Sequence, residues 1–481
     1  MPQPVRHVQP PLRFIPTAYN PWVMRVVHWM LPFFLRVRVR PWLPAGIRSI
    51  EVKNIEHLVD LYAQFEAKTA RFLMAVRHVE VDDPLSGLYL CSRAVNQAAK
   101  ARGIKLKQPV HTHFIYERGM TIWAGNGIGW LLSRIGGVPI RRGRRPDWVG
   151  LKAARKLMAE GDMPMVVAPE GATNGHSERL GPLEPGVAQL GFWCAEDLQR
   201  GHDAGENHLD IPAVFVLPIG IQYRYMQSNW PALAKLLSKL EAQSGLQPVA
   251  SKNPLEKDCY LRILGLGEHL IKTMETFYSR CHHKKLTTVE IADPPTVETE
   301  PETADEVCSH RLKNLLDQAL QVSEQFFDLS GKGTFVDRCR RIEEASWNYI
   351  YRDDLPELST LSMLEKGLAD WAAQEASLRE LHMRIVESFV AVDGLYIKEK
   401  LSFERCAETT LLMSDMLARL AGDKLPGRPR LGDRTITMTV QPPIAITPRL
   451  ADYQQNRKAG RAAVAAVTEE IRQALEDTIE R

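Results

Sequence analysis

A histidine and a carboxylate five positions apart carry the first chemistry that the sequence suggests. His78 and Asp83 belong to the stretch that begins with Arg77 and follows the apolar run at 72–76. A short apolar strand that ends in a histidine is a common way to mount a general base. A carboxylate within reach of the imidazole could hold it in one tautomer and stabilise its protonated form. The pair therefore suggests proton transfer, although His and Asp in one loop are more often a solvated turn.

An alternation of strands and helices must position this pair. Short apolar runs predict strands at 72–77, 110–116, 138–141, 163–168 and 211–223. Helical periodicity between them predicts helices at 54–70, 86–101, 128–135, 147–160 and 185–200, and Asn54 is expected to cap the first. This alternation indicates an α/β fold with a layered sheet and flanking helices.

A long helical block interrupts the alternation. One apolar face in this block is expected to belong to a core, with Leu364, Leu368, Trp371, Leu378, Leu381, Ile385, Phe389 and Val392 along it. Strand character returns at 435–440, and a last helix is predicted at 459–479. The sequence therefore predicts a basic, aromatic segment at 1–49, an α/β domain at 50–225 that closes at 433–481, and a large all-helical insertion at 226–432.

Composition and charge argue against several classes of protein. Hydrophobic residues make up 44% of the chain and charged residues 25%, which is typical of a globular protein. The formal net charge of +3 is too small to indicate nucleic-acid binding. Seven cysteines without a CxxC pair match no zinc pattern and fit a reducing compartment. We therefore expect neither a metal nor a nucleic-acid partner.

The first fifty residues combine arginines with aromatic side chains and contain no acidic residue. The apolar stretch at 22–35 is shorter than the span of about 20 residues that a bilayer requires, and Arg25, His28 and Pro32 interrupt it. Aromatic residues beside basic ones favour a segment in the interface of an anionic membrane. The alternative is a helix packed on the core with solvated arginines. We expect a peripheral or monotopic protein on the cytoplasmic side of a membrane.

Four segments, taken in order, resemble blocks of the glycerolipid acyltransferase family, in particular the PlsC-like lysophosphatidic acid acyltransferases. The His-x4-Asp block is similar to His78–Asp83, and the glycine-led strand that ends in arginine is similar to Gly136–Arg142. The Pro-Glu-Gly-Thr block resembles Pro169–Ala172, and the apolar strand with a central proline resembles Val216–Ile219. The resemblance covers about residues 50–225 and, less closely, 433–481.

The resemblance implies an O-acyltransferase of the 1-acylglycerol-3-phosphate type. It would move a fatty acyl group from acyl-CoA or acyl-carrier protein to a hydroxyl of a glycerol phosphate or lysophospholipid. His78 would be the general base and Asp83 would orient it. Arg142 would bind the acceptor phosphate, while Glu170 and Gly171 would shape the acceptor site. The acyl thioester is a co-substrate, so no cofactor is implied.

Departures from the family pattern surround the expected phosphate site. Arg77 stands where the family usually has Asn, Ala172-Thr173-Asn174 where Thr and an arginine are usual, and Leu183-Glu184 where a Phe-Lys pair is usual. These changes leave the reaction type intact but put the acceptor in question. Two alternatives stay open: an acyltransferase for a non-phosphate lysolipid, and a catalytically degenerate membrane scaffold. Asp82 beside Asp83 is a further ambiguity, which spacing resolves in favour of Asp83.

Overall fold

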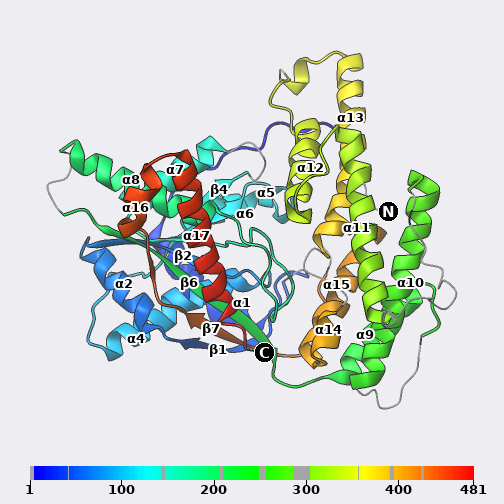
Figure 1. The fold of residues 1–481 in the computed structure, drawn as a ribbon, viewed down its shortest axis with the longest axis horizontal. Coiled ribbons are helices and arrows are strands. Elements are labelled where there is room, and N and C mark those ends of the chain that lie inside the picture. Colours follow the sequence, from blue (N-terminus) through cyan, green and yellow to red (C-terminus); the bar gives the residue numbers. More distant parts are fainter. Residues whose placement is uncertain are drawn as a thin grey trace. The chain divides into compact units, whose positions relative to one another are not determined.

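The computed structural model of this protein describes residues 5–41, 43–141, 147–205, 210–248, 256–284, 286, 304–355, 357–389, 395–423 and 427–480. The chain forms two compact units (Figure 1). The α/β unit comprises Arg13–Met226 and Gly432–Arg481, and the helical unit comprises Met1–Leu12 and Gln227–Leu431. The segment predicted at 1–49 is therefore divided between the two units after Leu12.

A single sheet organises the α/β unit, and its strands lie in the order β1-β7-β6-β2-β5-β3-β4, with β8 paired to β6. Strands β6, β2, β5, β3 and β4 run parallel, whereas β7 is antiparallel to β6 and parallel to β1. The predicted α/β class is thereby confirmed. The strands are β1 (Ile47–Lys53), β2 (Ala70–Val76), β3 (His113–Glu117), β4 (Gly137–Ile140), β5 (Met165–Val167), β6 (Ala213–Tyr225), β7 (Arg434–Val440) and β8 (Ile444–Ala445).

Helices cover both faces of the sheet. Alternate residues of β2 point to opposite faces: Phe72 and Met74 join a core cluster with α1 and α2, whereas Leu73 and Ala75 join one with α7, α8 and α17. Both faces are covered, which explains why β2 reads as a continuous apolar run. The helices of this unit are α1 (Pro21–Arg36), α2 (Glu56–Glu66), α3 (Asp83–Tyr89), α4 (Asn96–Ala101), α5 (Met120–Ala124), α6 (Asn126–Arg134), α7 (Trp148–Glu160), α8 (Gly186–Asp203), α16 (Leu450–Gln454) and α17 (Arg457–Glu476).

Two local features of the α/β unit depend on backbone geometry. Gly220 of β6 lies so close to the segment after α17 that a Cβ there would stand 1.9 Å from the Oγ1 of Thr478. Asn54 has a φ of 55° in the turn between β1 and α2, a left-handed conformation that Asn tolerates better than most residues. The prediction that Asn54 caps α2 is wrong, because the cap position is Ile55 and has no side-chain hydrogen bond.

The helical unit contains seven α-helices in its described residues, and it also includes the start of the chain. The backbone N–H of Val8 donates to Asp370 Oδ1 at 2.8 Å, and that of Gln9 donates to Ile350 O at 2.7 Å. Val8 is buried in a cluster with Trp347 and Ile350. The helices are α9 (Trp230–Gln243), α10 (Glu256–His282), α11 (Ala304–Phe327), α12 (Phe335–Ile350), α13 (Met363–Glu387), α14 (Tyr396–Glu399) and α15 (Phe403–Ala421).

Only part of the apolar face that was predicted to belong to the core is buried. Ile385 and Phe389 are buried, as expected, but Leu364, Leu368 and Trp371 are 72%, 55% and 64% exposed. Periodicity identifies an apolar helix face, but it does not identify what covers that face. The prediction of a core position is therefore wrong for the first part of the stripe. Val392 lies outside the described residues.

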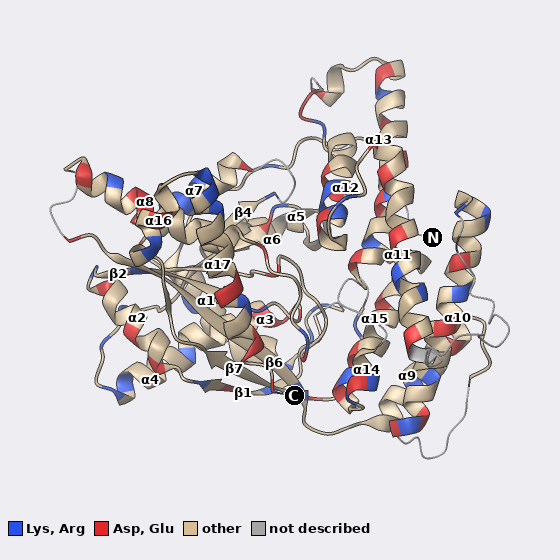
Figure 2. Cartoon of the chain, viewed as in Figure 1, with Lys and Arg blue, Asp and Glu red and all other residues tan. Residues whose placement is uncertain are grey.

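Charge and hydrophobicity are distributed as burial requires. Figure 2 shows both signs of charge along the helices, whereas the central strands of the sheet are almost uncoloured. Charged side chains are rarely buried without a partner, so the few charged residues at the ends of the strands are notable. Within the described residues, no helix is both long enough and apolar enough to cross a membrane.

Buried histidines of the α/β unit predict a loss of stability in mild acid. Burial lowers the pKa of His111 from 6.5 to about 4, and the imidazole N–H at Nε2 donates to Ile135 O at 2.7 Å. The neutral ring is stabilising above the unfolded-state pKa of 6.5, and this contribution is lost as the pH falls toward 4, because the unfolded state then binds the proton more readily. His111 alone accounts for a loss on the order of 3 kcal/mol over this window.

Urea unfolding at several pH values measures this dependence. We expect the free energy of unfolding of His111→Asn to fall less steeply between pH 6.5 and 4 than that of the wild type. His202→Asn is the matched control, because His202 is exposed on α8 and its replacement leaves the slope unchanged. Equal slopes for the wild type and His111→Asn would contradict the prediction.

Candidate active site

The residues singled out in the sequence follow the carboxyl ends of parallel strands. His78 comes two positions after β2, and Glu170 and Gly171 come shortly after β5. These two strands are adjacent and parallel, with Leu73 paired to Met165. Their carboxyl ends therefore meet at one edge of the sheet, which is where open α/β sheets bind ligands. Arg142 lies outside the described residues.

His78 and Asp83 form a hydrogen-bonded pair at this edge. The Nδ1 of His78 lies 2.9 Å from Asp83 Oδ2. An ionised carboxylate can only accept, so Nδ1 carries the proton and Nε2 keeps its lone pair. The His78 side chain is 27% exposed, and no residue in the described part of the chain hydrogen-bonds its Nε2. The free nitrogen of a partly exposed imidazole is suited to accept a proton from a substrate.

Three donors and a helix end hold the Asp83 carboxylate in place. Besides His78, the backbone N–H of Glu80 donates to Oδ2 at 2.9 Å, and the Tyr223 hydroxyl donates to Oδ1 at 2.6 Å. Asp83 is also the first residue of α3, where the positive end of the helix dipole favours a negative charge. Both oxygens of Asp83 are thereby fixed, and the carboxylate fixes the imidazole in turn.

Asp82 has a different partner and a different environment. Its Oδ2 accepts a hydrogen bond from Arg434 of β7, and the side chain is fully buried. Burial raises the pKa of Asp82 to about 6, and the neighbouring Arg434 guanidinium opposes the shift. The same guanidinium stacks over the Tyr223 ring, 4.7 Å from its centre. Of the two adjacent acids, Asp83 contacts the histidine and Asp82 anchors the closing strand.

Glu170 is buried behind the histidine loop. The Asn174 side-chain amide donates to Glu170 Oε2 at 2.9 Å, and Arg77 Nε lies 3.6 Å from Oε1. Burial raises the pKa of Glu170 to about 7, although Arg77 and His78 oppose the shift. Gly171 has a φ of 73°, a left-handed conformation that favours glycine and turns the chain after β5.

Arg77, a departure from the family pattern, is buried, at 1% exposed. Its guanidinium donates to the carbonyl oxygens of Ser177 at 2.6 Å and His176 at 2.9 Å, and also to that of Arg179. These bonds tie the end of β2 to the loop at 171–179. Backbone bonds from Asn174 N–H to His78 O (3.3 Å) and from Gly175 N–H to Val79 O (3.1 Å) reinforce the same junction.

The structure thus brings His78, Asp83, Glu170 and Gly171 to one edge of the sheet. Sequence reasoning missed Tyr223 and Arg434, whose strands β6 and β7 follow distant parts of the chain. Tyr223 precedes the inserted block and Arg434 follows it, so no short stretch of sequence indicated that either residue belongs to the site. No group of three or more His, Cys, Asp or Glu side chains is placed to hold a metal ion in the ranges that the structure covers.

Comparisons with known proteins agree with this architecture. Residues 99–219 match the model of the Acyltransferase family. No curated protein and no solved structure matches the chain. The matched segment begins after His78 and Asp83 and includes Glu170 and Gly171. The family implies an acyl donor and a lipid acceptor in general terms. Within the α/β unit, residues 99–219 are therefore similar to an acyltransferase domain.

Proposed function

We propose that this protein transfers a fatty acyl group from acyl-CoA or acyl-carrier protein to a hydroxyl of a glycerol phosphate or lysophospholipid at a membrane surface. The observation that carries the proposal is the hydrogen bond of 2.9 Å between His78 Nδ1 and Asp83 Oδ2. It leaves Nε2 as a base at the sheet edge where α/β enzymes bind substrates. No cofactor is proposed beyond the acyl thioester itself.

The reaction proceeds by direct attack of the acceptor on the thioester. Nε2 of His78 takes the hydroxyl proton while the acceptor oxygen bonds to the thioester carbonyl carbon. The tetrahedral intermediate collapses, the C–S bond breaks, and the imidazolium returns its proton to the leaving thiolate. Asp83 stabilises the imidazolium and keeps its orientation. The products are the acylated acceptor and a free thiol.

The acceptor site combines Arg142 with the loop after β5. Arg142 is proposed to bind the phosphate, because a guanidinium matches two phosphate oxygens at once. Gly171 turns the chain and Glu170 lies beneath it, so both shape the site without needing to react. Burial raises the pKa of Glu170 to about 7, so this carboxyl changes charge near neutral pH.

A second candidate function is acyl transfer to a lysolipid without a phosphate. The observation that favours it is the position of Asn174. It lies in the block where the family usually has an arginine, and its side-chain amide donates to Glu170 instead of presenting a positive charge. A third reading, a membrane scaffold without activity, requires that the ordered His78–Asp83 pair has no catalytic role.

Helix α1 is proposed to hold the α/β unit on the membrane. Met24, Leu31 and Leu35 are buried against the unit. Trp22, Val26, Trp29 and Phe33 recur at helical spacing on the opposite side and are 71%, 55%, 79% and 50% exposed. Arg25 lies over the Trp22 ring at 4.9 Å. An exposed aromatic face beside arginines is typical of a helix that lies in an anionic membrane interface.

Replacement of His78 by alanine tests the base. We expect kcat to fall by about 10²–10⁴-fold, the usual contribution of general-base catalysis. Transfer of a labelled acyl group to lysophosphatidate by the purified protein measures this change. His202→Ala, on the exposed surface of α8, is expected to keep wild-type activity. Equal transfer by His78→Ala and wild type would remove the catalytic claim and favour the scaffold.

An acceptor panel tests the phosphate site. Wild-type protein is offered glycerol 3-phosphate, lysophosphatidate and a neutral lysolipid, and the KM for each acceptor is compared with that of Arg142→Ala. We expect Arg142→Ala to raise KM about tenfold or more for phosphate acceptors alone, because a charge-assisted contact is lost. Arg145→Ala, three residues along in the same basic stretch, is the matched control. A wild-type preference for the neutral lysolipid would establish the second candidate instead.

Vesicle binding tests the role of α1. The triple variant Trp22→Ser, Trp29→Ser, Phe33→Ser is expected to bind vesicles containing anionic lipid about tenfold or more weakly, because it loses the exposed apolar face. The matched control replaces Leu364, Leu368 and Trp371 of α13 by serine, which removes equally exposed apolar groups from the helical unit. Unchanged flotation of the α1 variant with vesicles would exclude α1 as the membrane contact.

A further inference from the structure

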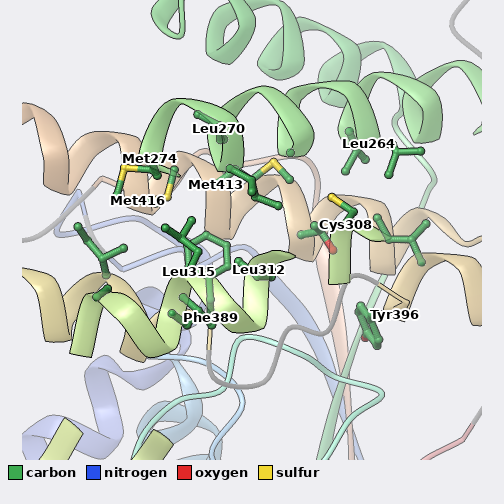
Figure 3. A pocket seen from close by; sticks show the side chains of 18 of the residues that line it. Leu264, Leu270, Met274, Cys308, Leu312, Leu315, Phe389, Tyr396, Met413 and Met416 are labelled. Atoms are coloured by element: carbon green, nitrogen blue, oxygen red, sulfur yellow. The ribbon is translucent and has the colours of Figure 1, made fainter. Parts of the chain in front are cut away.

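A cavity opens among the helices of the helical unit (Figure 3). It encloses about 1000 Å³, part of it open to solvent. Its walls come chiefly from α10, α11 and α15, together with Ile385 of α13 and Phe389. The cavity is built entirely within one unit, so the acyltransferase site has no part in it.

The lining of the cavity is almost wholly apolar and adaptable. Leucine, isoleucine and methionine dominate, and Met274, Met413 and Met416 stand close to Leu270 and Leu315 in Figure 3. Methionine side chains are flexible and polarisable, so they fit ligands of irregular or variable shape. Among the residues that the structure describes, no Lys, Arg, Asp or Glu side chain is part of the lining. Such a wall suits a hydrocarbon and disfavours a charged or strongly polar ligand body.

The polar groups in the wall are mostly satisfied by the protein. The Tyr278 hydroxyl is hydrogen-bonded to His382 Nδ1 at 2.7 Å, and the Tyr396 hydroxyl donates to Glu408 Oε2 at 2.7 Å. Thr409 differs from both. Its side-chain oxygen is buried and has no hydrogen-bond partner in the described part of the chain, although the residue lines the cavity and is only 8% exposed.

The neighbouring threonine shows that this lack of a partner is specific to Thr409. Thr410 Oγ1 donates to Cys406 O at 2.7 Å, the usual bond of a threonine to the preceding helical turn. Thr409 makes no such bond, so the hydroxyl of this cavity-lining residue is buried without a partner in the described part of the chain. Buried hydroxyls in folded proteins are nearly always paired, so this exception needs an explanation, and a polar group of a bound ligand would supply one.

We propose that this cavity binds one long-chain acyl group, with the hydrocarbon between α10, α11 and α15 and an oxygen of its carboxyl or ester group accepting a hydrogen bond from Thr409. An apolar volume whose described lining includes one buried hydroxyl without a partner fits this ligand class. A fatty acid, a lysolipid and an acyl thioester all present the same chemistry. The helical unit is then an acyl-binding module, whichever acceptor the α/β unit uses.

A pair of glycines on α10 provides a matched test. Gly267 lines the cavity, and a Cβ there would lie 3.3 Å from the flexible Cε of Met413. Gly265 stands on the same helix, is exposed, and would place a Cβ in open space. Gly267→Leu therefore fills the cavity, while Gly265→Leu makes the same change of residue outside it. Both replace a helical glycine with a better helix former, so neither is expected to unfold the helix.

Titration of the full-length protein with the fluorescent fatty acid cis-parinaric acid measures occupancy. We expect Gly267→Leu to raise the Kd about tenfold or more, because a filled cavity cannot admit the chain. Gly265→Leu and His78→Ala are expected to bind as the wild type does. Equal Kd values for Gly267→Leu and Gly265→Leu would overturn the proposal. Fatty-acid binding and acyl transfer are measured in separate assays. A negative result for the cavity therefore does not affect the proposed acyltransferase activity, and a negative result for acyl transfer does not affect the proposed cavity.

Competition identifies the source of the acyl chain and the role of the hydroxyl. Displacement of the probe by palmitate, palmitoyl lysophosphatidate and palmitoyl-CoA, ranked by affinity, distinguishes the three sources. Across laurate, myristate and palmitate, each added methylene is expected to tighten binding up to about fourfold. Thr409→Val is expected to weaken palmitate binding severalfold, and Thr409→Ser to retain it. Equal affinity of these two variants for palmitate would contradict the role assigned to Thr409. Equal affinities for laurate, myristate and palmitate would contradict the proposal that the cavity binds the hydrocarbon chain.

Discussion

The geometry of the α/β unit depends on one carboxylate. Asp83 accepts hydrogen bonds from His78, from the backbone of Glu80 and from Tyr223, so both of its oxygens are committed. His78 and Glu80 lie in the loop between β2 and α3, whereas Tyr223 belongs to β6. An acceptor held by several donors cannot rotate without losing one of them. The tautomer and direction of the His78 ring are therefore set by the whole junction rather than by a flexible side chain.

The buried charged residues around this junction each have their own partner. Asp82 is adjacent to Asp83, yet it pairs with Arg434, and burial moves its pKa to about 6. The Arg77 guanidinium faces Glu170 and donates to four backbone carbonyls, so it holds this junction in place. Removing one partner of such a buried pair leaves the other charge uncompensated, which costs about 3–5 kcal/mol. Arg77, which departs from the family pattern, thus adds buried hydrogen bonds that order the loop after Glu170.

Local patterns predicted the parts of the site that are local in sequence. The apolar run of β2, the helix that starts near Asp83 and the five-residue spacing from His78 could all be read from one short stretch. The rest depends on contacts that no short stretch encodes. Tyr223 lies 140 residues from Asp83, and Arg434 lies 352 residues from Asp82. The prediction that the whole apolar stripe of α13 is buried was wrong for a related reason. Apolar periodicity identifies a helix face but does not show whether another element covers it.

The order of the sheet explains how a large insertion is compatible with this site. Strands β6 and β7 are antiparallel neighbours, and Tyr225 pairs with Arg434, so the chain leaves and re-enters the sheet at adjacent positions. Closing a long loop costs little more entropy than closing a short one, because the cost grows only with the logarithm of length. The site is nevertheless incomplete until the chain returns, since Arg434 supplies the charge that compensates buried Asp82. In the sequence, most of the helical unit is therefore inserted between β6 and β7, and Asp82 gains its partner Arg434 only when β7 joins the sheet.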